Sequence, residues 1–178
     1  AVGDVNRDGR LDLLLSHLAL EHNTLYTGGD RVFMDRTVES GMAEDDMRFT
    51  GFGCGLFDYD HDGDLDLAVV NGEVRGVMIE PEVRAASFWK RYAEPNLLFE
   101  NDGTGRFGEV SDRAGPGLEI ERVGRGSAVA DHDNDGDPAI FVPNTAGTAV
   151  LLPDDTALAD KLLELPLPGT HDNTYRSR

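Results

Sequence analysis

The chain has 178 residues, enough to bury the core of one domain, and its 16 basic and 34 acidic residues give a formal charge of -18. This balance argues against a nucleic-acid partner, because no basic stripe is present to neutralise phosphates. No apolar run approaches the length of a membrane span, so we expect no transmembrane segment.

The first element is a short apolar strand that leads into a loop rich in side-chain oxygens. Residues 4–12 read Asp-Val-Asn-Arg-Asp-Gly-Arg-Leu-Asp. A loop of the form Asp-x-Asp-x-Asp-Gly can wrap Ca²⁺, which takes about six to eight oxygen ligands, and the sixth-position glycine permits the sharp turn. The predicted ligands are the side chains of Asp4, Asn6 and Asp8, the backbone carbonyl of Arg10 and the ninth-position carboxylate of Asp12.

The same loop recurs at residues 58–66 with a carboxylate at every alternate position. Its predicted ligands are the side chains of Asp58, Asp60, Asp62 and Asp66 and the backbone carbonyl of Asp64. An EF-hand would instead need a glutamate at the twelfth position, and that position is Val69. The apolar run at 65–70 contains β-branched residues and predicts a strand, so we expect this calcium loop to join two strands.

A third loop, at residues 131–139, keeps the pattern only in part. Asp131, Asp133, Asp135 and the seventh-position Asp137 are retained, but Ala139 replaces the ninth-position carboxylate. We therefore expect a weaker calcium site here. The loops begin 54 and 73 residues apart, which indicates an internal repeat.

Each repeat consists of about four short strands: one before the loop, one after it, an Asn-x-Leu strand and an aromatic-led strand. The last two are seen at residues 23–26 and 32–34 in the first copy, and at 96–101 and 106–110 in the second. This pattern predicts an all-β fold, a partial β-propeller of about three blades in residues 1–152. Residues 153–178 are predicted to form an irregular or short-helical tail, with a helix from Asp154 through Leu163, and to begin a further repeat.

The second repeat is longer than the first because of an insertion at residues 73–95. Its middle part combines aromatic and basic side chains: Phe88, Trp89, Lys90, Arg91 and Tyr92. A long insertion of this kind either contacts a partner or decorates the surface. Propellers usually close with about four to eight blades, so we expect further blades outside this chain or self-assembly.

The loops, the Gly-Phe-Gly-Cys-Gly-Leu-Phe strand before Asp58 and the Asn-Leu-Leu-Phe-Glu-Asn strand at 96–101 resemble FG-GAP/VCBS repeats. These repeats form the blades of integrin-α-like propellers, and their order here resembles the UnbV/ASPIC (cartilage acidic protein-like) type. The resemblance implies a calcium-stabilised β-propeller, extracellular or periplasmic, that binds a protein or glycan. It also implies that the loop metals are structural and take no part in chemistry.

Two other function classes remain as alternatives. One is a scaffold, catalytic or not, of a polysaccharide-degrading enzyme; however, the sequence has no nucleophile-elbow or phosphate-binding glycine motif, so we expect no enzymatic activity. The other is a dockerin-like module, in which each loop precedes a helix. Residues 11–21 alone could form such a helix, but the spacing of 54 and 73 residues does not fit.

Overall fold

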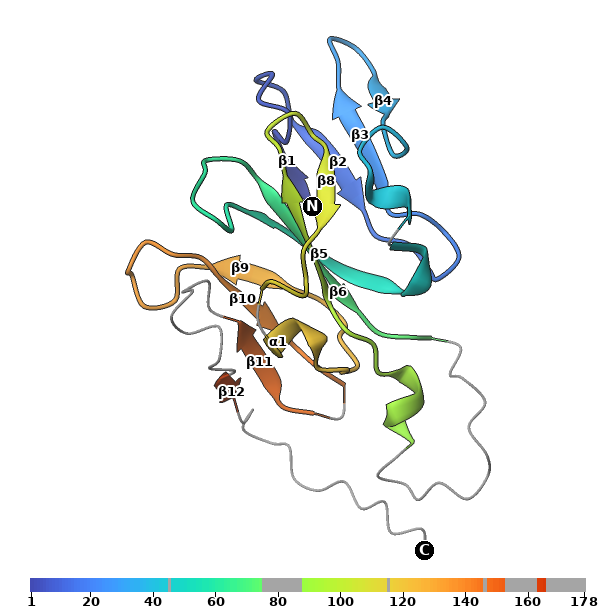
Figure 1. The fold of residues 1–178 in the computed structure, drawn as a ribbon, viewed down its shortest axis with the longest axis vertical. Helices are drawn as coiled ribbons and strands as arrows, with labels where there is room; N and C mark the ends of the chain where they lie inside the picture. The colour runs from blue at the N-terminus through green and yellow to red at the C-terminus, as the bar shows by residue number, and fades with distance from the viewer. Residues whose placement is uncertain (45, 75–87, 115, 146, 153–162, 166–178) are drawn as a thin grey trace, which may run out of the picture.

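A computed structural model describes residues 1–44, 46–74, 88–114, 116–145, 147–152 and 163–165. These residues form three four-stranded antiparallel sheets and, within the described ranges, a single short α-helix, α1 (Pro116–Glu119). The all-β prediction is therefore confirmed at the level of fold class. The described residues form no closed ring (Figure 1).

In each sheet the strands lie side by side in chain order. The first sheet is β1 (Val2–Gly3), β2 (Asp12–Leu15), β3 (Thr24–Gly28) and β4 (Phe33–Asp35). The middle sheet is β5 (Gly51–Phe57), β6 (Asp66–Asn71), β7 (Leu97–Asn101) and β8 (Phe107–Glu109). The third sheet is β9 (Ala128–Ala130), β10 (Ala139–Val142), β11 (Ala149–Leu152) and β12 (Leu163–Leu165). Because Asp12–Leu15 is a strand, a helix over residues 11–21, and with it the dockerin-like arrangement, is excluded.

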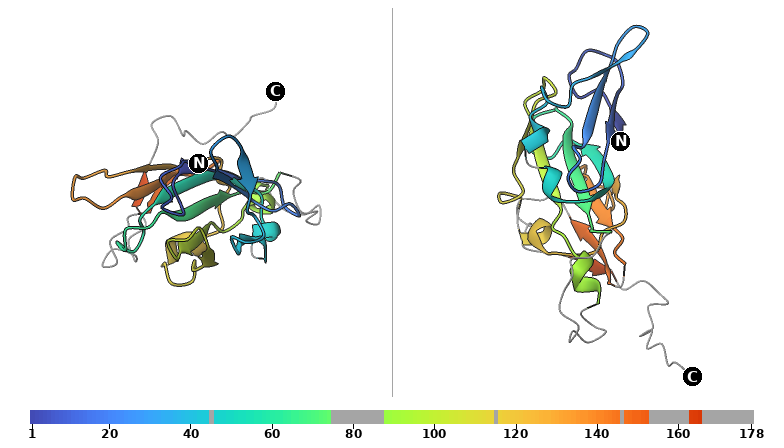
Figure 2. Two further views of the ribbon diagram at one scale, coloured as in Figure 1. Left: turned by 90° about the horizontal axis from the view of Figure 1, so that it is seen from above. Right: turned by 90° about the vertical axis from the view of Figure 1, so that its right-hand side faces the viewer.

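The sheets follow one another along the long axis of the molecule, with the first sheet at the top and the third at the bottom (Figures 1 and 2). Apolar side chains fill both junctions. Between the first and middle sheets, Leu14 and Leu25 pack with Leu67, Val69 and Phe99. Between the middle and third sheets, the buried cluster is formed chiefly by Ala68, Val70, Leu98, Ile140, Val142 and Val150.

Strand β6 lies between these two clusters, and all six of its residues are buried. A strand that is covered on both faces should read as a continuous apolar run, and Leu-Ala-Val-Val at 67–70 does so. In contrast, alternate residues of β2 are buried and exposed, with Leu14 at 2 % and Leu15 at 42 % exposure. The first sheet is therefore covered on one face only.

The tail and the insertion differ in part from the expectations. Most of the helix predicted from Asp154 lies outside the described residues, but Leu163–Leu165 is a strand that pairs with β11. The tail thus supplies the fourth strand of the third sheet, since the edge of β11 offers backbone groups that need partners. In the insertion, residues 75–87 lie outside the described part, and Trp89–Tyr92 forms one 3-10 turn. Within the described residues no helix is long or apolar enough to cross a membrane.

Candidate metal centre

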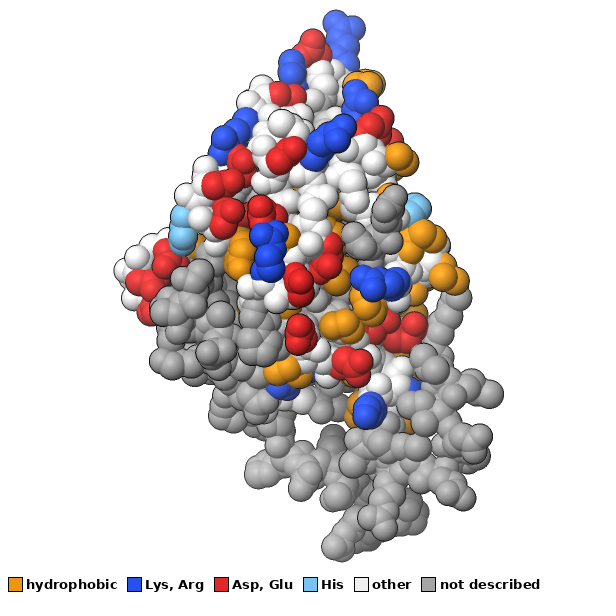
Figure 3. Space-filling view, in the orientation of Figure 1, with side chains coloured by type: hydrophobic (Ala, Val, Ile, Leu, Met, Phe, Trp, Pro, Cys, Tyr) orange, Lys and Arg blue, Asp and Glu red, His pale blue; other side chains and the backbone are white. Residues whose placement is uncertain are grey.

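The three acidic loops share one backbone geometry. Each joins the first two strands of its sheet, and all three lie along the left-hand side in Figure 1, where acidic side chains gather in Figure 3. The sixth-position glycines have φ values of 83°, 90° and 101°, in the left-handed region that glycine adopts without strain (Gly9, Gly63 and Gly136). The fourth-position residues are also left-handed, at 56°, 60° and 63° (Arg7, His61 and Asn134).

The same hydrogen bonds hold the three loops in this shape. In each loop the first-position carboxylate accepts the N–H of the sixth-position glycine, at 2.8, 2.9 and 3.1 Å (Asp4–Gly9, Asp58–Gly63 and Asp131–Gly136). The fifth-position carboxylate accepts the N–H of the seventh residue, at 2.9, 2.8 and 3.0 Å (Asp8–Arg10, Asp62–Asp64 and Asp135–Asp137). Such local acceptors explain why aspartate is preferred at these turns.

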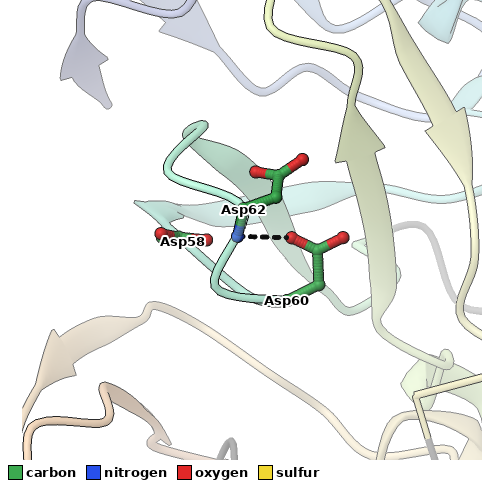
Figure 4. A group of neighbouring side chains, drawn as sticks. All are labelled: Asp58, Asp60 and Asp62. Atoms are coloured by element: carbon green, nitrogen blue, oxygen red, sulfur yellow. Dashed lines mark hydrogen bonds between the residues drawn. The ribbon is translucent and has the colours of Figure 1, made fainter.

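The middle loop brings three of its predicted ligands together. One carboxylate oxygen from each of Asp58, Asp60 and Asp62 lies within 4.8 Å of the others, and the Asp62 N–H donates to Asp60 Oδ1 at 3.2 Å (Figure 4). Asp58 Oδ1 is buried and accepts no hydrogen bond from the described residues. A buried carboxylate oxygen without a donor is costly, so a bound cation would satisfy it.

The ninth-position carboxylates, Asp12 and Asp66, also accept backbone hydrogen bonds that the sequence alone did not reveal. Asp66 is fully buried; one of its oxygens accepts the N–H of Tyr59 at 2.7 Å and the other accepts that of Asn101 at 2.8 Å. In the first sheet Asp12 accepts the N–H of Val5 at 2.9 Å and that of Gly28 at 2.8 Å. In the first and middle sheets this carboxylate therefore ties the loop to the third strand of its own sheet.

The burial of Asp66 also destabilises its ionised form. Burial raises the pKa of Asp66 to about 6, although its two backbone hydrogen bonds lower it, and the nearby Asp60 and Asp62 raise it further. Positive charge in the loop would oppose these effects and keep the carboxylate ionised.

The first and third loops differ from the middle loop in their oxygen donors. In the first, the oxygens of Asp4 and Asn6 both accept the Asp8 N–H at 3.1 Å, so they converge as the predicted ligands should. In the third, one oxygen from each of the three exposed aspartates lies within 4.8 Å of the others (Asp131, Asp133 and Asp135). The ninth position, Ala139, is buried at 2 % exposure and brings no carboxylate to this loop.

The seventh-position side chains connect each loop to the one before it. Asp64, predicted as a ligand through its carbonyl, turns its 7 % exposed carboxylate toward the Arg7 guanidinium of the first loop. Asp137 lies 3.4 Å from His61 of the middle loop. The fourth-position residue of one loop thus reaches the seventh position of the next. The sequence does not mark this contact, because the left-handed conformation of the fourth-position residue is visible only in the structure.

Asn101 is a further residue that the sequence identified only as part of a strand. Its buried amide donates to the carbonyl of Val5 in the first loop at 2.8 Å and to that of Leu65 in the middle loop at 3.0 Å. Its oxygen accepts the Gly105 N–H at 3.1 Å. One side chain therefore joins the first loop, the middle loop and the β7–β8 turn.

All the groups that converge in the loops are oxygens, which are the donors preferred by Ca²⁺ and Mg²⁺. Ca²⁺ accepts about six to eight oxygens in flexible geometry, so it suits a carboxylate loop better than Mg²⁺, which requires a strict octahedron. The donor set and the unsatisfied oxygen of Asp58 therefore fit a hard divalent cation.

A separate polar cluster lies between the middle and third sheets, at the ends of the strands opposite the loops. Glu94 is buried at 8 % exposure and accepts the Thr50 N–H at 2.9 Å. The Arg125 guanidinium donates to the carbonyls of Gly72 and Glu73 at 2.8 and 2.9 Å. Burial raises the pKa of Glu94 to about 7, opposed by its backbone hydrogen bonds and by Arg125.

This raised pKa predicts a pH-dependent cost to folding. Below pH about 4.5 the Glu94 carboxyl is protonated in both states; between about 4.5 and 7 only the folded state keeps the proton, so stability falls as pH rises. Glu94→Gln retains an acceptor for Thr50, and we expect it to raise the melting temperature more at pH 8 than at pH 5. Thermal denaturation of both proteins at the two pH values measures this. Glu109→Gln, at a half-exposed carboxylate outside this cluster, is the control.

Comparisons with known proteins identify no family for this chain. No protein-family model matches the sequence, and no curated protein matches it.

Proposed function

We propose that the chain is a calcium-binding β-propeller module of FG-GAP/VCBS type that acts in extracellular or periplasmic binding. The observation that carries this proposal is the recurrence of one loop geometry in three successive sheets, with clustered carboxylates and a buried, unsatisfied oxygen on Asp58. A single acidic turn would carry little weight. Three with the same hydrogen bonds support a common ligand, and Ca²⁺ fits the oxygen donors best.

In this proposal each sheet is one blade, and the ion has a structural role. Like charges crowd the middle loop most: five of its nine residues, from Asp58 to Asp66, are aspartates. A divalent cation offsets their repulsion, and in the first and middle loops the ninth-position carboxylate connects the loop to the third strand. Calcium therefore stabilises the edge of each blade from which the loops project.

Calcium loading is expected to raise the melting temperature. An ion that binds only the folded state stabilises it by about 2.7 kcal/mol per site at a hundredfold excess over Kd. Isothermal titration of the chelator-treated protein should resolve two tighter sites, at the first and middle loops, and a weaker one at the third. The combined Asp58→Asn, Asp60→Asn and Asp62→Asn variant should lose one of the tighter sites. An unchanged melting temperature after addition of chelator and of Ca²⁺ would contradict the metal-binding role.

The surface proposed for ligand contact is the aromatic turn of the insertion. Phe88 and Trp89 are 43 % and 39 % exposed, and their ring centroids lie 5.2 Å apart. The Tyr92 ring is 5.6 Å from Phe88, and the Arg91 guanidinium lies over Phe88 at 5.0 Å. Exposed aromatic and arginine side chains are typical of binding hot spots.

Trp89 is the sole tryptophan of the chain, so its fluorescence reports directly on this surface. We expect glycan or protein ligands of the chain to change that emission on titration. The Trp89→Ala variant lacks this fluorophore, so its affinity is measured by isothermal titration, and we expect binding to weaken at least about tenfold, as the loss of a hot spot does. Val38→Ala, at an exposed apolar residue in the turn after β4, is the matched control. If Trp89→Ala left the affinity of a ligand unchanged, the contact surface would lie elsewhere.

A further inference from the structure

One face of the first sheet is exposed, whereas the equivalent face of the middle sheet is buried. Strand register makes the two sheets directly comparable, because Asp12 and Asp66 occupy the same position and hold the same kind of hydrogen bonds. Counting from them, Leu13 and Leu15 correspond to Leu67 and Val69. By the same register, Tyr26 and Phe33 correspond to Phe99 and Phe107.

The exposure of these matched positions differs sharply. In the middle sheet Leu67, Val69, Phe99 and Phe107 are at most 5 % exposed, because the first sheet packs on them. In the first sheet Leu15 is 42 % and Phe33 is 51 % exposed, and Leu13 and Tyr26 are half-buried. Val2 of β1 pairs with Leu13 of β2 and is 59 % exposed. We call these five residues the open face of the first sheet: Val2, Leu13, Leu15, Tyr26 and Phe33.

We infer that the open face binds a second copy of this chain, through the far face of its third sheet. The chain already makes this contact twice, because the first sheet packs on the middle sheet and the middle sheet on the third with the same register positions. A third repetition of the contact joins two copies head to tail. On the far face of the third sheet Phe141, which corresponds to Leu14, is half-buried, and Ala128 and Ala130 of β9 are exposed. Leu151, which pairs with Phe141, is buried within the chain at 6 % exposure, so Phe141 and the two β9 alanines make the contact.

The loop side chains agree with this pairing. Within the chain, the fourth-position residue of one loop meets the seventh position of the next: Arg7 meets Asp64, and His61 lies 3.4 Å from Asp137. Continued to a second copy, fourth-position Asn134 meets seventh-position Arg10. An amide oxygen can accept a hydrogen bond from a guanidinium, whereas an arginine at position 134 would repel it. The inference depends on sheet packing and holds whether or not the loops bind calcium.

The mass of the chain in solution tests the association. Light scattering on the eluting full chain should give 19.4 kDa at low concentration and at least twice that mass as concentration rises. Leu15→Asp places a charge in the contact and should weaken association at least about tenfold. Val38→Asp, on an exposed residue of the turn that follows β4, outside the open face, is the control and should not change it. A chain of 19.4 kDa at every concentration would overturn the inference and leave the open face to another partner.

Charge exchange between the loops tests the head-to-tail direction. Asn134→Arg should weaken association, and the double variant Asn134→Arg with Arg10→Asp should restore it by recreating the pairing of Arg7 with Asp64. Arginine tolerates this position, because Arg7 adopts the same left-handed conformation in the first loop. Circular dichroism and calcium titration of each variant separate a folding or metal defect from an association defect. Association that is sensitive to Leu15→Asp but not to Asn134→Arg would show face-to-face pairing and overturn the head-to-tail arrangement.

Discussion

Asp66→Ala is expected to lower the free energy of unfolding by about 2–5 kcal/mol, because it leaves one buried and one part-buried backbone N–H group without an acceptor, and a buried one costs about 1–3 kcal/mol. Those groups belong to Tyr59 at the start of the loop and Asn101 at the end of β7. The substitution also removes the ninth-position carboxylate from the middle loop. Chemical denaturation at saturating and at chelated calcium measures the two contributions separately.

Three matched variants make this prediction specific. Asp137→Ala removes a 40 % exposed carboxylate at the seventh position and should cost less than about 1 kcal/mol. Asp66→Asn keeps one acceptor oxygen and should fall between the two. Asp12→Ala breaks the equivalent pair of hydrogen bonds in the first sheet and should resemble Asp66→Ala. Equal losses for Asp66→Ala and Asp137→Ala would contradict the special role of the ninth position.

The calcium dependence of Asp66→Ala distinguishes bracing from ligation. If the carboxylate only braces the loop, the loss of stability is the same with chelator and with calcium. If it also binds the ion, the loss is greater with calcium, because the variant gains less from the ion. We expect the second result, since burial raises the pKa of Asp66 and a nearby cation would stabilise its ionised form.

The strands were predictable because their signals are local. Glycine at the sixth loop position, apolar runs after each loop and Asn-x-Leu before β3 and β7 all mark their boundaries within a few residues. The fourth strand of the third sheet was not predicted, because it lacks such local signals. Leu163–Leu165 has no loop or aromatic marker beside it, and its strand conformation depends on pairing with β11, which is a non-local contact.

The loop contacts were less accessible to sequence analysis than the loops themselves. Alternate aspartates with a glycine are sufficient to predict clustered carboxylates, and the middle and third loops have them. The pairing of Arg7 with Asp64 spans 57 positions of sequence and requires the relative placement of two sheets. Glu94, inside the predicted insertion, was likewise unremarkable until its burial between sheets was known.

The second large effect is expected at Asn101, whose amide joins two loops. Asn101→Asp replaces the donor with a carboxylate that faces the carbonyl oxygens of Val5 and Leu65, 2.8 and 3.0 Å from the present amide nitrogen. It also adds a negative charge beside Asp66, which accepts the Asn101 N–H. Breaking a buried network and leaving a charge uncompensated costs about 3–5 kcal/mol. We therefore expect a large loss in the free energy of unfolding, measured by chemical denaturation at pH 7.

Asn96→Asp, at a 6 % exposed residue next to β7, provides the matched control. Asn96 uses its oxygen to accept the Asn71 N–H at 3.0 Å, and a carboxylate can still do so. The loss at Asn96 should therefore be less than half of that at Asn101. The Asn101→Asp loss should also shrink below pH 5, since a protonated carboxyl regains one donor and carries no charge. Equal and pH-independent losses at the two positions would show that the Asn101 amide is not what joins the first and middle loops.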